Sequence, residues 1–265
     1  ELTPMSFTAK DVQNLRQATG AGMMDAKRAL EETDGDFDAA AKALREKGLA
    51  KSVDRSDRDN SDGVVAVATG PGVAVIVELK SETDFAAKKP EFVAAAQTLA
   101  DTVAAGGSVD DHKDLVDDFK VTLKENIEVG RVEKVEVADG QAVDIYLHKQ
   151  EGRGVNAVIV VLEGGDEALA HEVAVSAAFS KPRYLTRDEV PQAEADEERA
   201  TLEGITRAEG KPEQAIEKIV SGRLNAWYKD QVLLEQPYAK DDKQSITDLL
   251  GGATIARFAQ VYIGS

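Results

Sequence analysis

Apolar positions in the first 50 residues recur at intervals of three and four, the spacing that places side chains on one face of a helix. The pattern predicts three short helices: one that begins at Thr8, a second over 23–32, and a third that ends at Gly48. Thr8 followed by Asp11 is typical of a capped helix start. We therefore expect residues 1–50 to form a compact bundle. The expected apolar positions are Val12, Leu15, Ala26, Ala29, Leu30, Phe37, Ala40, Ala41 and Leu44.

A different pattern follows a polar stretch. Residues 51–62 have Val53 as their only apolar side chain, which favours a solvated linker or an exposed helix and places a domain boundary there. Alternating apolar positions then predict strands over 63–68 and 73–79, joined by a Gly/Pro turn. These two strands are expected to form a hairpin.

The order of hairpin, helix and late strand occurs twice along the chain. The further predicted elements are helices after Pro90 and around Phe119, a strand over 131–137, a hairpin over 142–148 and 157–162, a helix around Val173, and a strand over 257–263. We therefore expect an α+β fold with two similar subdomains, 63–140 and 141–265, each with a small antiparallel sheet.

An insertion at about 192–229 interrupts the second subdomain. A helix over roughly 193–208 is predicted to end at Gly210, and Lys211-Pro212 to start another whose apolar positions follow coiled-coil spacing. We expect an antiparallel helical hairpin with charged outer faces. Its expected use is structural or partner-contacting.

Composition excludes several classes of protein. With 265 residues and 42% apolar content the chain can bury a sizeable core, and the absence of cysteine excludes disulfides and thiolate sites. No apolar run approaches the roughly 20 residues that a membrane helix needs. No signal peptide precedes Met5, which we expect to be the initiator, with residues 1–4 added ahead of it. We expect a cytoplasmic protein.

The charge balance bears on the kind of partner. The chain has 49 acidic and 32 basic residues and a formal net charge of −17. That charge repels phosphate backbones beyond a Debye length of about 8 Å, so direct nucleic-acid binding is not expected. An acidic protein can still act in a nucleic-acid pathway by binding a protein partner.

Signatures of enzyme chemistry are scarce. The segments 20–22 and 70–72 resemble the start of a dinucleotide loop, but neither has the third glycine, and no P-loop occurs. His112, His148 and His171 lack metalloprotease spacing, and only His148, at the end of a predicted strand, is placed to contact something. The acidic residues spread along helix faces and linkers, which favours solvated surface over a paired-carboxylate site. We therefore expect no enzyme activity, no bound cofactor and no metal.

Two places along the chain hold apolar side chains without an obvious core position. Of the adjacent Met23 and Met24, one can serve the core, which leaves the other for solvent or a partner. Phe85 follows the second strand within a polar segment, so it either folds back near Phe92 or projects as a wedge for a partner. Thr83-Asp84 could equally be a plain helix cap. The residues alone leave these alternatives open.

Two long motifs resemble the signatures of a known family. Residues 15–30 (LRQATGAGMMDAKRAL) and 78–88 (ELKSETDFAAK) are similar to the two signatures of the elongation factor Ts family, the guanine-nucleotide exchange factors of bacterial translation. They occur in the family's order and spacing, and the resemblance extends over nearly the whole chain. Two departures stand out: Lys80 replaces a usual Asn, and Ala86 replaces a usual Val.

The resemblance implies a partner, elongation factor Tu, a GTPase that leaves its cycle bound to GDP. In the family an Asp-Phe pair, here Asp84 and Phe85, inserts beside the partner's nucleotide site and loosens its hold on Mg²⁺ and phosphate. The family's amino-terminal bundle, similar to ubiquitin-associated domains, docks on the GTPase domain. The partner-binding residues implied for this chain are Thr83, Asp84, Phe85, Ala86, Arg16, Met23, Met24 and His148.

The hypothesis is therefore an exchange factor that forms a heterodimer with elongation factor Tu and makes or breaks no bond itself. In relatives the helical hairpin serves as an accessory contact or a dimerisation element. The alternative is a scaffold module that holds a partner through its amino-terminal bundle without promoting GDP release.

Overall fold

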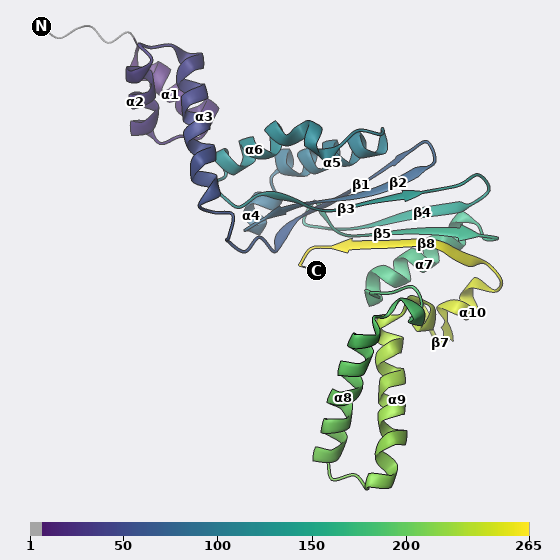
Figure 1. The fold of residues 1–265 in the computed structure, drawn as a ribbon. Helices are drawn as coiled ribbons and strands as arrows, with labels where there is room; N and C mark the ends of the chain where they lie inside the picture. The colour runs from purple at the N-terminus through teal and green to yellow at the C-terminus, as the bar shows by residue number, and fades with distance from the viewer. Residues whose placement is uncertain (1–6, 265) are drawn as a thin grey trace, which may run out of the picture. The chain divides into compact units, whose positions relative to one another are not determined.

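The computed structural model describes residues 7–264, so Met5 and the residues before it lie outside the described part. Helices alternate with small sheets (Figure 1), which confirms the predicted α+β class. The chain divides into two compact units. The first holds the residues up to Lys134, Lys149–Asn156 and the residues from Val261 on; the second holds Val135–His148 and Ala157–Gln260.

The amino-terminal bundle consists of α1 (Ala9–Thr19), α2 (Met23–Glu32) and α3 (Phe37–Val53). The predicted capping is present: Thr8 Oγ1 accepts from Asp11 N at 3.3 Å, and the Asp11 carboxylate accepts from Thr8 N at 2.8 Å. These bonds satisfy backbone donors that the first turn leaves without a helical partner. The apolar side chains predicted for the three helices form the core of the bundle, with the exception of Phe37.

Helix α3 differs from its prediction in two ways. It continues past Gly48 to Val53, so part of the expected linker is helical. A Cβ at position 48 would lie 2.6 Å from Val121 Cγ1, so the glycine lets α3 approach the end of α6 (Lys113–Thr122) closely. A mid-helix glycine costs roughly 1 kcal/mol relative to alanine, and this close approach is a physical reason for glycine at the position. Phe37 is 37% exposed, because as the first residue of α3 it lies at the edge of the bundle.

The first sheet has the order β1-β2-β3. Strands β1 (Asp62–Gly70) and β2 (Val73–Ser81) pair antiparallel from Asp62↔Ser81 to Gly70↔Val73, and both run longer than predicted. Strand β3 is Glu128–Glu136. Helix α5 (Pro90–Ala104) packs on β1 and β2, and its buried face includes the predicted Phe92 and Leu99. The other elements here are α4 (Asp84–Ala87) and η1 (Val109–His112).

The second sheet repeats that order as β4-β5-β8, with strands Ala142–Gln150, Arg153–Glu163 and Thr254–Tyr262. Helix α7 (Glu167–Ser180) supplies the apolar cover that α5 supplies in the first. The sequence did not predict a small two-stranded sheet and a short helix late in the chain. The sheet consists of β6 (Pro237–Tyr238) and β7 (Asp241–Ser245), and the short helix is α10 (Ile246–Leu250). Two single 3₁₀ turns, η2 (Arg187–Glu189) and η3 (Leu233–Glu235), also lie in this part of the chain.

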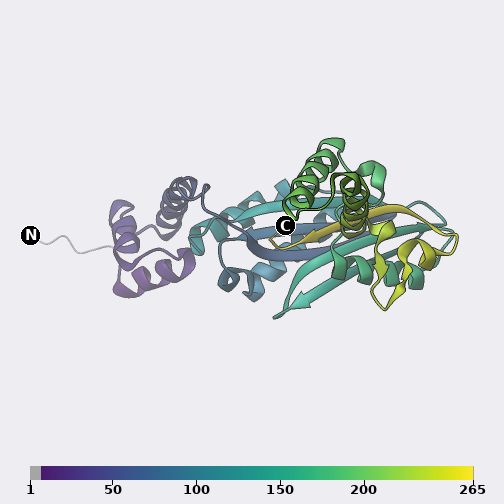
Figure 2. The same ribbon diagram turned by 90° about the horizontal axis from the view of Figure 1, so that it is seen from below.

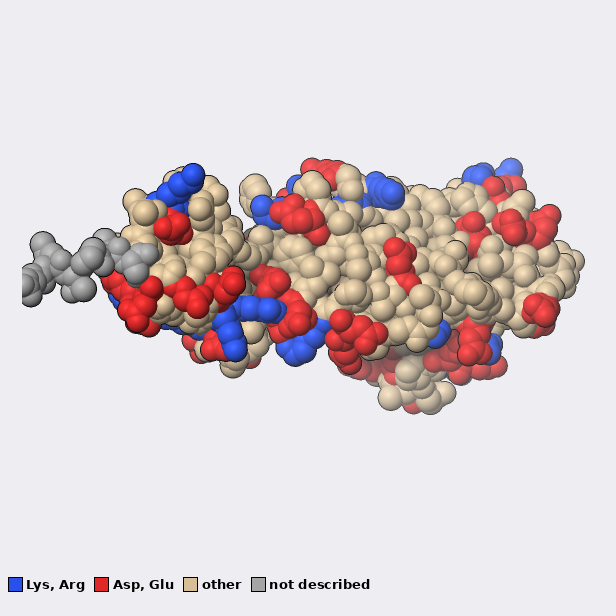
Figure 3. Space-filling model, turned by 90° about the horizontal axis from the view of Figure 1, so that it is seen from above, with Lys and Arg blue, Asp and Glu red and all other residues tan. Residues whose placement is uncertain are grey.

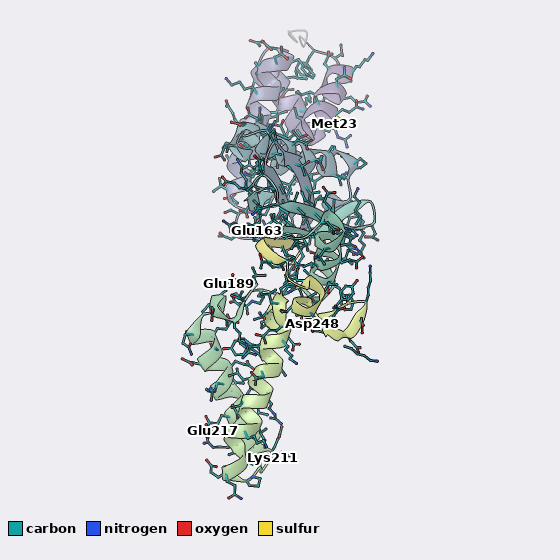
Figure 4. The ribbon with its side chains drawn as sticks, turned by 90° about the vertical axis from the view of Figure 1, so that its right-hand side faces the viewer. Met23, Glu163, Glu189, Lys211, Glu217 and Asp248 are labelled. Carbon is teal, nitrogen blue, oxygen red and sulfur yellow. The ribbon has the colours of Figure 1, made fainter. Side chains whose placement is uncertain are left out.

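The predicted helical hairpin is present as α8 (Gln192–Ala208) and α9 (Glu213–Gln231). The two helices run side by side in Figure 1, and Figure 2 looks nearly along them. Figure 4 shows Lys211 and Glu217 at the hairpin's free tip. A salt bridge of 2.7 Å from Arg223 to Glu209 ties the two helices together near that end.

Candidate partner interface

The turn that follows β2 carries the residues singled out by the second motif. Thr83 is the N-cap of α4, and its hydroxyl accepts from Ala86 N at 3.3 Å. Ala86 and Ala87 are buried, whereas the Phe85 side chain between them and Asp84 points to solvent. The two alanines therefore anchor one side of a single helical turn, and the other side presents the ring.

Phe85 is 81% exposed, so it does not fold under the following helix. Phe92 is fully buried and packs edge-on against Phe119, with ring centroids 5.2 Å apart. Of the alternatives that the sequence left open, the buried ring is therefore wrong. An exposed phenylalanine on an ordered turn is uncommon and is typical of binding surfaces.

Glu125 holds the backbone that leads into this turn. One carboxylate oxygen of Glu125 accepts from Glu82 N at 3.0 Å and from Thr83 N at 3.1 Å, and the other accepts from the Thr83 hydroxyl at 2.6 Å. Three donors thus converge on one partly buried carboxylate. Bonds to a charged acceptor are stronger than neutral ones, so the entry to α4 is fixed in position.

A reciprocal bond completes this connection. Asn126 N donates to a carboxylate oxygen of Glu82 at 2.6 Å, and the Asn126 side chain donates to the carbonyls of Ser56 and Arg58 at 3.1 and 2.8 Å. Asn126 is buried, so its own amide groups need these partners in place of water. The turn is therefore tied both to the segment after α6 and to the segment after α3.

The Asp84 carboxylate is oriented by Lys88. Lys88 Nζ lies 2.5 Å from Asp84 Oδ2 and 2.6 Å from Glu151 Oε2, so one ammonium bridges two carboxylates. The hydrogen bond from Lys88 lowers the pKa of Asp84, and the bond to Asp84, followed by the one to Glu151, raises the pKa of Lys88. Both groups therefore stay charged through the neutral range, and the turn presents a negative charge beside an apolar ring.

The bundle presents a second exposed apolar group. Met23 and Met24 are 48% and 68% exposed, so the expectation that one of them serves the core is wrong. Both lie in the first turn of α2, ahead of the first buried residue of that helix, Ala26, and Figure 4 labels Met23 at the bundle's edge. Arg16, on α1, is also exposed.

His148 belongs to the second unit and is exposed on β4, which continues two residues beyond it. Its Nδ1 lies 3.3 Å from the Tyr146 hydroxyl, and the two rings stack with centroids 6.4 Å apart. Of the sequence-predicted residues, Thr83 to Ala86 therefore share one turn, Arg16, Met23 and Met24 share the bundle, and His148 lies in the other unit.

Other kinds of site receive no support. Within residues 7–264 no three His, Asp or Glu side chains gather so that they could hold a metal ion. In the same range no helix has the length and apolar content to cross a membrane. Asp and Glu side chains spread over the face in Figure 3 with Lys and Arg among them, as expected of solvated surface.

Comparison with known proteins gives one consistent result. Residues 82–265 match the family model described as elongation factor TS. The chain is 44% identical to an elongation factor Ts of a Nocardioides species, covering 98% of this chain and 99% of the relative. It is 42% identical to that of Mycobacterium tuberculosis, with 98% of each covered, and 41% identical to that of Kineococcus radiotolerans, with 94% and 95% covered.

The chain belongs to the elongation factor Ts family. Membership of the elongation factor Ts family gives it a role in translation elongation. The second motif includes the turn that presents Phe85, and the first includes the exposed start of α2.

Reasoning from the sequence missed the residues that hold the turn. Glu125 lies 42 positions from Thr83, and no local pattern connects them. Lys88 stands within the second elongation factor Ts motif, and its i,i+4 spacing from Asp84 on a helical turn was an available signal. Glu151 lies in the β4–β5 turn, and only the folded chain brings it to Lys88.

Proposed function

We propose that this protein promotes GDP release from elongation factor Tu, with Phe85 as the inserting residue. The supporting observation is the ring itself, 81% exposed on a turn whose backbone is fixed by Glu125. A rigidly presented ring loses little conformational entropy when it enters a partner, so its burial can be used to displace the partner's own side chains.

Asp84 gives the turn a second means of action. Its carboxylate is ionised and held by Lys88 beside the ring. Placed next to a bound diphosphate, a carboxylate repels the phosphate charge and attracts the accompanying Mg²⁺. Phe85 would displace structure around the nucleotide, while Asp84 would weaken the nucleotide's electrostatic hold.

The thermodynamics of exchange requires no covalent step. A factor that binds nucleotide-free elongation factor Tu more tightly than the GDP form must, by linkage, weaken GDP binding by the same ratio. The proposed activity therefore needs a difference in affinity between two states of the partner and no catalytic group. We propose Arg16, Met23, Met24 and His148 as further contacts that supply affinity.

The test is release of a fluorescent GDP analogue from elongation factor Tu. Added protein is expected to accelerate release well above the spontaneous rate, and the F85A variant is expected to bind but not to accelerate. Release at the spontaneous rate with the wild-type protein would overturn the proposal.

The exposed pair Met23 and Met24 favours one other function, that of a scaffold that binds through the bundle. A scaffold would form the complex and leave GDP release unchanged. Deleting residues 1–50 would then abolish all binding, whereas an exchange factor would keep measurable binding through Phe85 and its neighbours.

A further inference from the structure

A cavity of about 190 Å³ lies where the bundle meets the end of α6. Its walls come from the end of α1, the first turn of α2 and the connection between them, from α3, and from Arg55, Val121 and Lys124. Each water molecule occupies about 30 Å³ of liquid, so the space accommodates several waters or a small polyatomic ion.

The charge of the lining is opposite to that of the whole protein. Four cations, Lys47, Lys51, Arg55 and Lys124, face one carboxylate, Asp25. Lys47 lies 3.6 Å from Asp25, and neither of the pair is buried, so three positive charges are left over. In a chain of formal net charge −17, this is a local concentration of positive charge that raises the local concentration of anions.

Three of these cations have unused hydrogen-bonding capacity. Within residues 7–264, Lys51 and Lys124 form no salt bridge and no side-chain hydrogen bond. Arg55 donates from Nη2 to the Lys120 carbonyl at 2.9 Å, but its Nε is buried and has no hydrogen-bond partner in the same range. A buried donor left unpaired is costly, and an oxygen-rich ligand would remove that cost.

The start of α2 adds backbone donors to the same wall. Its N-cap is Gly22, which lines the cavity and supplies no side-chain cap. The first N–H groups of a helix have no helical acceptors, and the helix dipole favours negative charge there. Gly22 brings no side chain to these donors, and the nearest acid is Asp25, whose Oδ2 lies 3.6 Å from where a Cβ at position 22 would be.

We propose that this cavity binds a small multivalent oxyanion of the phosphate class. Lys51, Lys124 and Arg55 would neutralise its charge, and the N–H groups at the start of α2 would bind its oxygens. Because the walls come from both the bundle and the segment after α6, a bound anion would hold the two together. This proposal is independent of the exchange activity.

Calorimetric titration of the free protein with inorganic diphosphate tests the proposal, against acetate and sodium chloride at matched ionic strength. The informative variant is K51Q/K124Q, because both lysines are exposed and their loss leaves the packing intact. The matched control is K149Q/K229Q, which removes the same charge at exposed positions outside the cavity.

Saturable binding of diphosphate is expected, with a dissociation constant that rises about tenfold or more in K51Q/K124Q and stays within about twofold in the control. Amide resonances of Gly22 and Met23 are expected to shift with the same dissociation constant. Equal affinity in the two double variants would overturn the proposal, as would a response to diphosphate no larger than that to sodium chloride.

Discussion

Glu125 accepts a 2.6 Å hydrogen bond from the Thr83 hydroxyl across 42 positions of sequence. The bond joins the loop after α6 to the N-cap of the turn that presents Phe85, and the same carboxylate takes two further backbone donors from Glu82 and Thr83. The exposed ring therefore owes its position to a residue far from its own motif.

Replacing Phe85 by alanine is expected to lower the accelerated GDP release by on the order of 30-fold, as for a central interface residue. Thermal stability is expected to change little, within about 0.5 kcal/mol, because the ring is 81% exposed. The matched control is F179A, since Phe179 is 82% exposed on another helix. Equal loss of exchange in both variants would contradict the assignment.

F92A, at a fully buried ring, is expected to cost about 3–5 kcal/mol of unfolding free energy.

Replacing Glu125 by glutamine is expected to lower exchange severalfold and the free energy of unfolding by about 1 kcal/mol. The amide keeps one acceptor oxygen but turns an NH₂ group towards a donor, and it loses the charge that strengthens the bonds. Stopped-flow release and chemical denaturation measure the two effects. The control is E136Q at an exposed strand end. T83S, which keeps the hydroxyl, is expected to retain exchange, whereas T83V is expected to behave like E125Q.

The pH dependence of the turn follows from Asp84 and Lys88. The pKa of Asp84 in the folded protein lies below its ordinary value of 3.8, so the pair is fully formed above about pH 3.8 and is lost as pH falls through the folded value. The pKa of Lys88 lies above 10.5, so its contribution is present below about pH 10.5 and is lost as pH rises through the folded value. Exchange is therefore expected to show no titration from this pair across neutral pH.

NMR titration of the Asp84 carboxylate checks this directly. In K88M the pKa of Asp84 is expected to rise towards 3.8, because its first cause of depression is removed. K89M, at the neighbouring exposed lysine, is expected to leave the Asp84 titration in place. An unchanged Asp84 pKa in K88M would show that the pair does not form in solution.

Replacing Gly48 by alanine is expected to loosen the contact between the amino-terminal bundle and α6. A Cβ there would lie 2.6 Å from a methyl group of Val121, which is stiff about χ1, so G48A is expected to cost roughly 1–3 kcal/mol of local stability. Hydrogen exchange in α3 and α6 measures the loss. V121A is expected to restore most of it in the double variant. If G48A alone leaves exchange rates in both helices unchanged, the close packing of α3 and α6 is not maintained in solution.

Most helices and strands could be predicted because their side chains repeat with a clear period. Helix α2 matched its predicted limits, since Gly22 precedes it and its apolar face is regular. Helix α3 was predicted too short, because a glycine signals an end unless a neighbour such as Val121 approaches it. Strands β6 and β7 were missed because their few residues are largely polar.

The residues of the candidate site likewise include some that the sequence indicated and some that it did not. Phe85 stood out in the sequence as a ring without a place in the strand, but only the folded chain shows it 81% exposed, with Phe92 packed against Phe119 instead. The prediction that one of Met23 and Met24 serves the core was wrong, because a residue before the first buried position of a helix need not face the core. Glu125 and Glu151 act through tertiary contacts that leave no periodic trace.

The stretch 121–126 has a consequence for any attempt to redesign this protein. Val121 and Thr122 contact the bundle at Gly48 and Gly20, and Glu125 and Asn126 hold the turn before Phe85. The two proposed partner-contacting regions of the first unit, the amino-terminal bundle and the turn over 83–86, are thus both in contact with this one short peptide. Grafting either region onto another scaffold requires this peptide as well, and an insertion within it would change the distance between the two regions without altering a residue in either.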